Sequence, residues 1–138
     1  MELNTTVFDQ LVSKVASDKT DQSDLQLLCF ISDSPETTQR FVEALLTQKS
    51  SASDAPETIV SKTMTILEAI ADKSNPIACV LMAHLWPFAS ALRMHDICDS
   101  IDIWVSHCNL PKVRRHLLML ASSEPDDGIR RHYEQMAK

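Results

Sequence analysis

Glycine is almost absent from this sequence: Gly128 is the single glycine among 138 residues. Dinucleotide-binding fingerprints, Walker phosphate loops, nucleophile elbows and EF-hand loops all need glycine at fixed positions in their turns. A sheet-rich fold is disfavoured as well, because tight hairpin turns depend on glycine. The scarcity of glycine therefore excludes these sites and points to a helical chain.

Export signals, paired-cysteine motifs and membrane-length apolar runs are also lacking. The first six residues contain neither a basic region nor an apolar one, as a signal peptide would. The longest apolar stretch, residues 76–92, is interrupted by Pro87 and is shorter than the ~20 residues that span a membrane. We therefore expect a cytoplasmic protein without a membrane segment, and reduced thiols at Cys29, Cys79, Cys98 and Cys108.

What the sequence does contain is a repeated helical pattern. Hydrophobic residues make up 44% of the chain, enough for one core, and they recur at spacings of three and four between capping residues and prolines. This pattern predicts an all-α fold: a single domain over residues 1–138 with seven or eight helices. Either an irregular bundle or a short helical-repeat stack satisfies it. Residues 49–55 are polar and predict a flexible loop.

Three helix starts are signalled by a capping residue followed closely by proline. Ser34 and Asn75 each directly precede a proline, and Asp54 lies two residues before one. Asp54 and Glu57 also have the spacing of a capping box. We therefore expect helices to begin just after Ser34, Asp54 and Asn75.

Residues 76–92 are predicted to form the central helix. A helix that is apolar on nearly all sides is buried when other helices surround it. Proline removes a backbone hydrogen bond and clashes with the preceding turn, so Pro87 predicts a kink or an end near Leu85.

The charge is divided unevenly along the chain. Residues 1–110 contain 7 basic and 15 acidic side chains, whereas residues 111–138 contain 6 basic and 4 acidic ones. General nucleic-acid binding needs a surface that neutralises phosphates, and the formal net charge of −6 opposes it. The C-terminal residues still form a candidate basic surface, carried by Lys112, Arg114, Arg115, Arg130 and Arg131.

The triplet Arg-Arg-His occurs twice, at residues 114–116 and 130–132, each time after a β-branched residue and a nearby proline. Its period of 16 fits one helix plus a short connector per copy. On these residues the segment 109–138 resembles HEAT-like α-helical repeat modules. That resemblance implies stacked helices that present a surface to a partner protein. The arginines also suit a plain solvated helix face whose stems cover the edge of the core.

Catalytic and metal-binding constellations are weak. His95 and Cys98 share a helical face, and His107 with Cys108 would complete four zinc ligands, but adjacent residues point ~100° apart on a helix. Asp96, Asp99 and Asp102 are spaced like a solvated stripe. No cysteine lies in a recognisable nucleophile motif. We therefore expect no enzyme activity and no cofactor. Metal binding is left open at the four candidate zinc ligands His95, Cys98, His107 and Cys108.

Aromatic residues gather in one part of the chain, where Trp86, Phe88 and Trp104 lie within a short span. Aromatic side chains are enriched at the centres of interfaces, although most are core residues. We therefore predict a non-catalytic protein–protein interaction module (an adaptor, regulator or small chaperone) whose partner is another protein or a second copy. The alternative is a nucleic-acid-associated regulator that uses the basic C-terminal helices. The candidate partner-binding residues are Trp86, Phe88, Trp104, Arg114, Arg115, Arg130 and Arg131.

Overall fold

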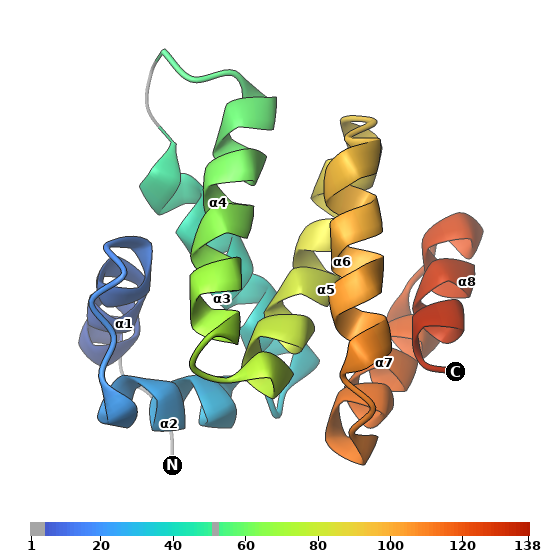
Figure 1. Cartoon of the computed structure of the whole chain (residues 1–138), viewed down its shortest axis with the longest axis horizontal. Coiled ribbons are helices and arrows are strands. Elements are labelled where there is room, and N and C mark those ends of the chain that lie inside the picture. Colours follow the sequence, from blue (N-terminus) through green and yellow to red (C-terminus); the bar gives the residue numbers. More distant parts are fainter. Residues whose placement is uncertain (1–4, 51–52) are drawn as a thin grey trace.

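The computed structural model, which describes residues 5–50 and 53–138, is entirely helical within those ranges (Figure 1). No strand occurs there, so the prediction of an all-α fold with seven or eight helices is confirmed. The helices are α1 (Thr5–Ala16), α2 (Gln22–Ile31), α3 (Pro35–Lys49), α4 (Pro56–Ala71), α5 (Asn75–Ala91), α6 (His95–His107), α7 (Pro111–Ser123) and α8 (Asp127–Met136).

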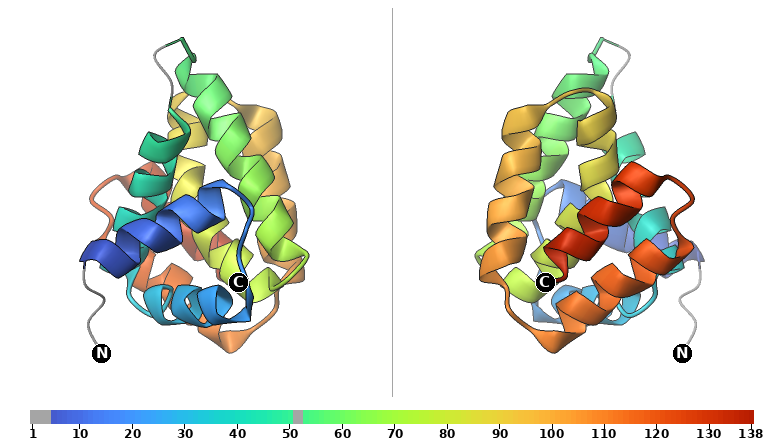
Figure 2. Two further views of the ribbon diagram at one scale, coloured as in Figure 1. Left: turned by 90° about the vertical axis from the view of Figure 1, so that its left-hand side faces the viewer. Right: turned by 90° about the vertical axis from the view of Figure 1, so that its right-hand side faces the viewer.

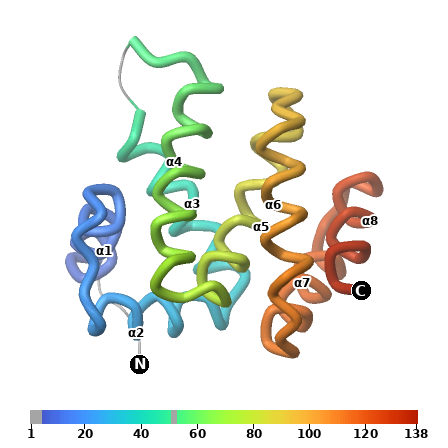
Figure 3. Tube along the Cα trace, in the orientation of Figure 1, coloured from blue at the N-terminus to red at the C-terminus, as the bar shows by residue number. Residues whose placement is uncertain are grey.

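Helix α5 lies at the centre of the bundle. Helices α3, α4, α6 and α7 all pack against it, and α8 packs on α7 at the side away from α1 (Figures 2 and 3). Every residue of α5 from Ile77 to Leu85 is buried, which confirms the prediction for this segment. Burying a leucine, isoleucine or valine side chain contributes about 1.5–3 kcal/mol, so this one helix organises much of the core.

The two ends of α5 differ from the predictions. The N-cap is Ser74 and not Asn75, because Asn75 is already the first helical residue. The helix also continues past Pro87 to Ala91, so of the two predicted outcomes, a kink or an end near Leu85, the end is wrong. Burial explains why the helix persists, since residues on both sides of Pro87, including Leu85 and Ala89, are packed into the core. Packing on all sides outweighs the local cost of proline.

Capping explains two of the other helix starts. Ser34 is the N-cap of α3, and its hydroxyl accepts a hydrogen bond from the Thr37 amide at 3.3 Å, as predicted. The N-cap of α4 is Ala55, which has no side-chain acceptor and makes no side-chain cap hydrogen bond, so the prediction that Asp54 caps this helix in a capping box with Glu57 is wrong. Asp54 forms an ion pair with Lys62, the seventh residue of α4, at 2.7 Å. Residues 51–52 of the predicted flexible loop lie outside the described residues.

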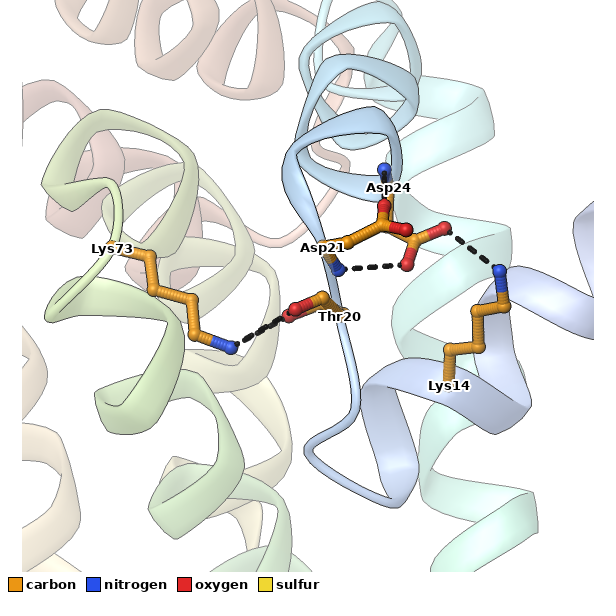
Figure 4. Close-up of polar contacts among 5 residues, drawn as sticks. All are labelled: Lys14, Thr20, Asp21, Asp24 and Lys73. Carbon is orange, nitrogen blue, oxygen red and sulfur yellow. Dashed lines mark hydrogen bonds and ion pairs between the residues drawn. The ribbon is translucent and has the colours of Figure 1, made fainter.

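A polar corner joins α1, α2 and the α4–α5 turn (Figure 4). Asp21 and Asp24 form a reciprocal capping box at the start of α2, with both N–H···O distances at 2.9 Å. Lys14 of α1 lies 3.3 Å from the Asp24 carboxylate. Lys73 donates to the Thr20 hydroxyl at 2.9 Å, across 53 residues of sequence. These contacts fix the N-terminal helices against the centre of the molecule.

No helix among the described residues is long and apolar enough to cross a membrane.

Candidate functional site

The three predicted aromatic residues do not form one exposed patch. All three are half-buried. Trp86 is stacked on His132 of α8, with ring centroids 3.8 Å apart. Phe88 faces a groove beside α3 and α4. The backbone carbonyl of Trp104 accepts a 3.4 Å contact from the Cys79 thiol of α5. The three residues therefore lie in separate places, and of the contacts named only the one between Trp86 and His132 joins two helices through side chains.

The predicted arginines divide between two helices. Arg114 and Arg115 are exposed on α7. Arg131 is exposed on α8, whereas Arg130 is half-buried and lies 2.7 Å from Asp127 and 3.7 Å from Glu134. Two carboxylates thus offset the charge of Arg130. Among the described residues, Arg114, Arg115 and Arg131 have no carboxylate partner, and two of these three, Arg114 and Arg115, are adjacent on α7.

The outward face of α7 combines these arginines with exposed apolar side chains. Leu118 is 51% exposed and Met119 is 44% exposed. Each follows an arginine by four residues and therefore lies beside it on the helix surface. Leu110, 43% exposed, extends the row by one further turn. We call this group the α7 surface: Leu110, Arg114, Arg115, Leu118 and Met119.

A cavity of about 290 Å³ adjoins the α7 surface where α7 meets the end of α2. Arg115 and Met119 form part of its wall. Lys112 also lines it, but its ammonium group lies 2.9 Å from the Asp33 carboxylate. The inner wall is His116, which is buried.

His116 belongs to a buried polar chain that crosses the core. Its Nε2 lies 2.8 Å from Nε2 of His84 on α5, and Nδ1 of His84 lies 2.8 Å from Oε1 of Gln39 on α3. The Gln39 amide nitrogen donates to Glu43, and this hydrogen bond leaves the Gln39 amide oxygen facing His84. His84 therefore donates from Nδ1, and His116 donates from Nε2 to the unprotonated nitrogen of His84. Each ring thus has its tautomer set by its neighbour.

Burial decides the charge of this histidine pair. Removal from water, and in second place the adjacent His116, lowers the pKa of His84 to about 3. Burial also lowers the pKa of His116, partly opposed by the backbone of Ser32. Both rings are therefore neutral at pH 7, and they join α5 to α7 without burying a charge.

A second histidine contact lies at the other Arg-Arg-His triplet. Nε2 of His132 lies 2.8 Å from the Asp102 carboxylate of α6, and Ser106 lines the same cavity of about 270 Å³. The Ser106 hydroxyl, however, donates to the Ile103 carbonyl at 2.9 Å. A serine nucleophile requires a hydrogen bond to the ring nitrogen opposite the carboxylate. These three residues are therefore not arranged as a nucleophilic triad.

The possible zinc ligands are dispersed. His95 and His107 are the first and last residues of α6 and are both exposed. Twelve residues of helix separate them by about 18 Å. Cys108 lies beside Cys79, and burial together with the Cys108 thiol raises the pKa of Cys79 to about 12. Among residues 5–50 and 53–138, no three histidine, cysteine or acidic side chains come close enough to hold a metal ion.

Sequence reasoning placed the emphasis on the arginines of the repeated triplet and missed its histidines. His116 and His132 both turn inward to α5, where they meet His84 and Trp86 respectively. The available signals were the triplet itself and the single imidazole within the apolar stretch 76–92. Gln39 carried no comparable signal.

Comparisons with known proteins found no counterpart: no protein-family model matches the chain, and neither a curated protein nor a solved structure is similar to it. The resemblance of residues 109–138 to HEAT-like modules stays a prediction.

Proposed function

We propose that this protein is a non-catalytic interaction module that binds an acidic, partly apolar segment of another protein on the α7 surface. The observation that carries this proposal is the exposure of Leu118 and Met119 next to two arginines, Arg114 and Arg115. Neighbouring exposed apolar side chains with a polar rim are typical of protein-binding surfaces. An adaptor, regulator or small chaperone would each use such a surface.

The chemistry of the α7 surface selects the partner. Methionine and arginine are enriched in protein interfaces, and a leucine supplies an apolar anchor for a shallow pocket. Arginine forms two parallel hydrogen bonds with a carboxylate, so Arg114 and Arg115 favour aspartate or glutamate on the partner. The partner segment is therefore expected to alternate apolar and acidic residues along one helical face.

Nucleic acid is the less favoured ligand for the same surface. Arg130 is already paired with Asp127 and Glu134, and Lys112 with Asp33. Phosphate backbones need several free cations and gain little from exposed leucine or methionine. The local chemistry thus supports a protein partner over a nucleic acid.

The test is capture of the partner by matched variants of the full-length protein. Immobilised Leu118→Asp and Arg115→Glu should each lose a partner that the unmodified protein retains, by at least about tenfold, as expected for a central contact. Arg131→Glu makes the same charge change on α8 and should retain it. Equal recovery by Leu118→Asp would contradict the proposal.

Two further measurements separate the alternatives. Fluorescence titration with DNA and RNA oligonucleotides at 50 and 200 mM salt should show no steeply salt-dependent binding. Steeply salt-dependent binding that Arg114→Glu abolishes would favour the nucleic-acid alternative. Light scattering of the purified chain tests whether a second copy occupies the surface. A dimer that Leu118→Asp dissociates would make that copy the partner.

A further inference from the structure

A second cavity, of about 470 Å³, lies on the other side of α7, where α3, α5, α7 and α8 meet. Its volume is within the range of small-ligand sites. Pro87, Phe88, Leu120 and Tyr133 contribute to its wall, which gives it an apolar body. We call it the Tyr133 cavity. It is separate from the α7 surface, and the inference drawn from it does not rest on the proposed function.

Tyr133 is the side chain that marks this cavity as a binding site. The residue is only 2% exposed, and no hydrogen bond of its hydroxyl is found among the residues that the structure describes. The hydroxyl is not fully enclosed, because the enclosed side-chain polar atom found there without a partner is Trp86 Nε1. A ligand in the cavity would supply the partner that a tyrosine hydroxyl usually has. Burial, and in second place the carboxylate of Glu124, raises the pKa of Tyr133, and both residues line the cavity. The hydroxyl is therefore protonated at pH 7.

The charges around the cavity are predominantly negative. Glu36 and Glu124 line it from α3 and from the end of α7. Arg40 lines it too and contributes one positive charge, and its guanidinium carbon also lies 5.6 Å from the centroid of the Phe8 ring of α1. Glu124 accepts one bond, from the Asp126 amide at 3.1 Å, which leaves its second carboxylate oxygen available.

We propose that the Tyr133 cavity binds an organic cation, namely a primary ammonium or guanidinium group on a short apolar stem. Glu36, Glu124 and the Tyr133 hydroxyl offer acceptors to the several N–H donors of such a group. Phe88 and Tyr133 provide aromatic rings that attract a cation and cover an alkyl stem. An anionic ligand would meet two carboxylates against the one guanidinium of Arg40 and is disfavoured. The cation is either a free amine or a lysine or arginine side chain of another protein.

The experiment is an amide NMR titration of the full chain at pH 7 and constant ionic strength. n-Butylammonium is the probe, with 1-butanol and butyrate as neutral and anionic controls of the same length. Saturable shifts should centre on Leu120 and Tyr133, and the ammonium should bind at least about tenfold more tightly than the alcohol. Equal binding of 1-butanol, or shifts elsewhere on the molecule, would overturn the proposal.

Matched variants identify the acceptors. Glu124→Gln and Glu36→Gln should each weaken n-butylammonium binding by about 5- to 20-fold, as expected for one charge-assisted hydrogen bond. Glu134→Gln removes the same charge from an exposed position on α8 and should leave binding unchanged. If Glu134→Gln and Glu124→Gln lost n-butylammonium affinity equally, the net charge of the protein would explain the loss, and the proposed site would be refuted. Tyr133→Phe keeps the ring and should weaken binding without changing the thermal unfolding midpoint by more than a few degrees.

A second titration distinguishes the source of the cation. Nα-acetyl-lysine methylamide presents the same ammonium group with peptide bonds attached. Tighter binding than n-butylammonium assigns the cavity to a protein side chain, and weaker binding assigns it to a free amine. Failure of both cations refutes the cavity proposal alone and leaves the α7 surface untouched.

Discussion

At the residue scale, the unusual feature is a pair of neutral histidines inside an apolar core. A buried imidazole is costly unless its nitrogens have partners. His84 meets this condition through Gln39 and His116, and the rings pack edge to face with centroids 5.1 Å apart. The pair therefore joins α5 to α7 by a hydrogen bond inside the core. Protonation of either ring places a charge in the core and lowers the stability of the fold.

The stability of the protein should fall as the pH is lowered below about 6.5, the ordinary histidine pKa. Because His84 and His116 have lowered pKa values when folded, the unfolded chain binds more protons than the native state in this range. Proton uptake thus favours unfolding by roughly 1.4 kcal/mol per pH unit for each proton. Urea unfolding between pH 7.5 and 5 measures this slope, and stability should be constant above pH 7.5 until other groups titrate.

The double variant His84→Leu, His116→Leu is the control for this slope. Replacing both partners by apolar side chains leaves no unsatisfied group, so the fold should survive while the pH dependence is largely lost. His95→Gln, at an exposed histidine, should keep the slope of the unmodified protein. A full slope in the double variant would contradict the assignment.

At the scale of single helices, local signals and packing compete. Ser34 and Pro35 start α3 as expected, because the cap is made within four residues of sequence. Pro87 does not end α5, because the energy that holds this helix comes from neighbours elsewhere in the chain. The N-cap of α4 was displaced by one residue, from Asp54 to Ala55, and has no side-chain cap. Local chemistry thus predicts helix starts within about one residue, and burial decides where a helix persists.

The cap of α3 is expected to contribute measurably to stability. Ser34→Ala removes the acceptor for the Thr37 amide and should lower the free energy of unfolding by about 1 kcal/mol. Ser61→Ala, on the exposed face of α4, should not lower it, since alanine is the better helix former. Chemical denaturation of both variants decides the matter, and equal effects would argue against the cap.

Helix α5 should not tolerate a charge in its buried segment. Leu81 is fully buried, so Leu81→Asp places an unpaired carboxylate in the core and should abolish folding. Leu81→Met keeps the volume and should cost less than about 1.5 kcal/mol. Circular dichroism and size-exclusion chromatography distinguish the two, and a stable, soluble Leu81→Asp protein would refute the central position of α5.

At the scale of the whole molecule, the fold class was predictable and the candidate sites were only partly so. Hydrophobic spacing and the lack of glycine predicted the helices and the buried α5, because both depend on local patterns. The pairing of His84 with His116 depends on how α5 and α7 cross, and the cavity at Tyr133 on how four helices meet. No local spacing encodes either arrangement. The exposure of Arg114 and Arg115 was consistent with the predicted surface, but the adjacent Leu118 and Met119 were not singled out.

The position of His116 also has a consequence for synthesis on the ribosome. His84 emerges 32 residues before the ring that completes its hydrogen bonds. At about 5–20 residues per second, a gap of this length lasts a few seconds. During that interval α5 has been synthesised but His84 still lacks its hydrogen-bond partner His116. The core can be completed only after α7 has been synthesised. A translational pause placed before residue 111 would prolong this vulnerable stage and should increase capture by chaperones.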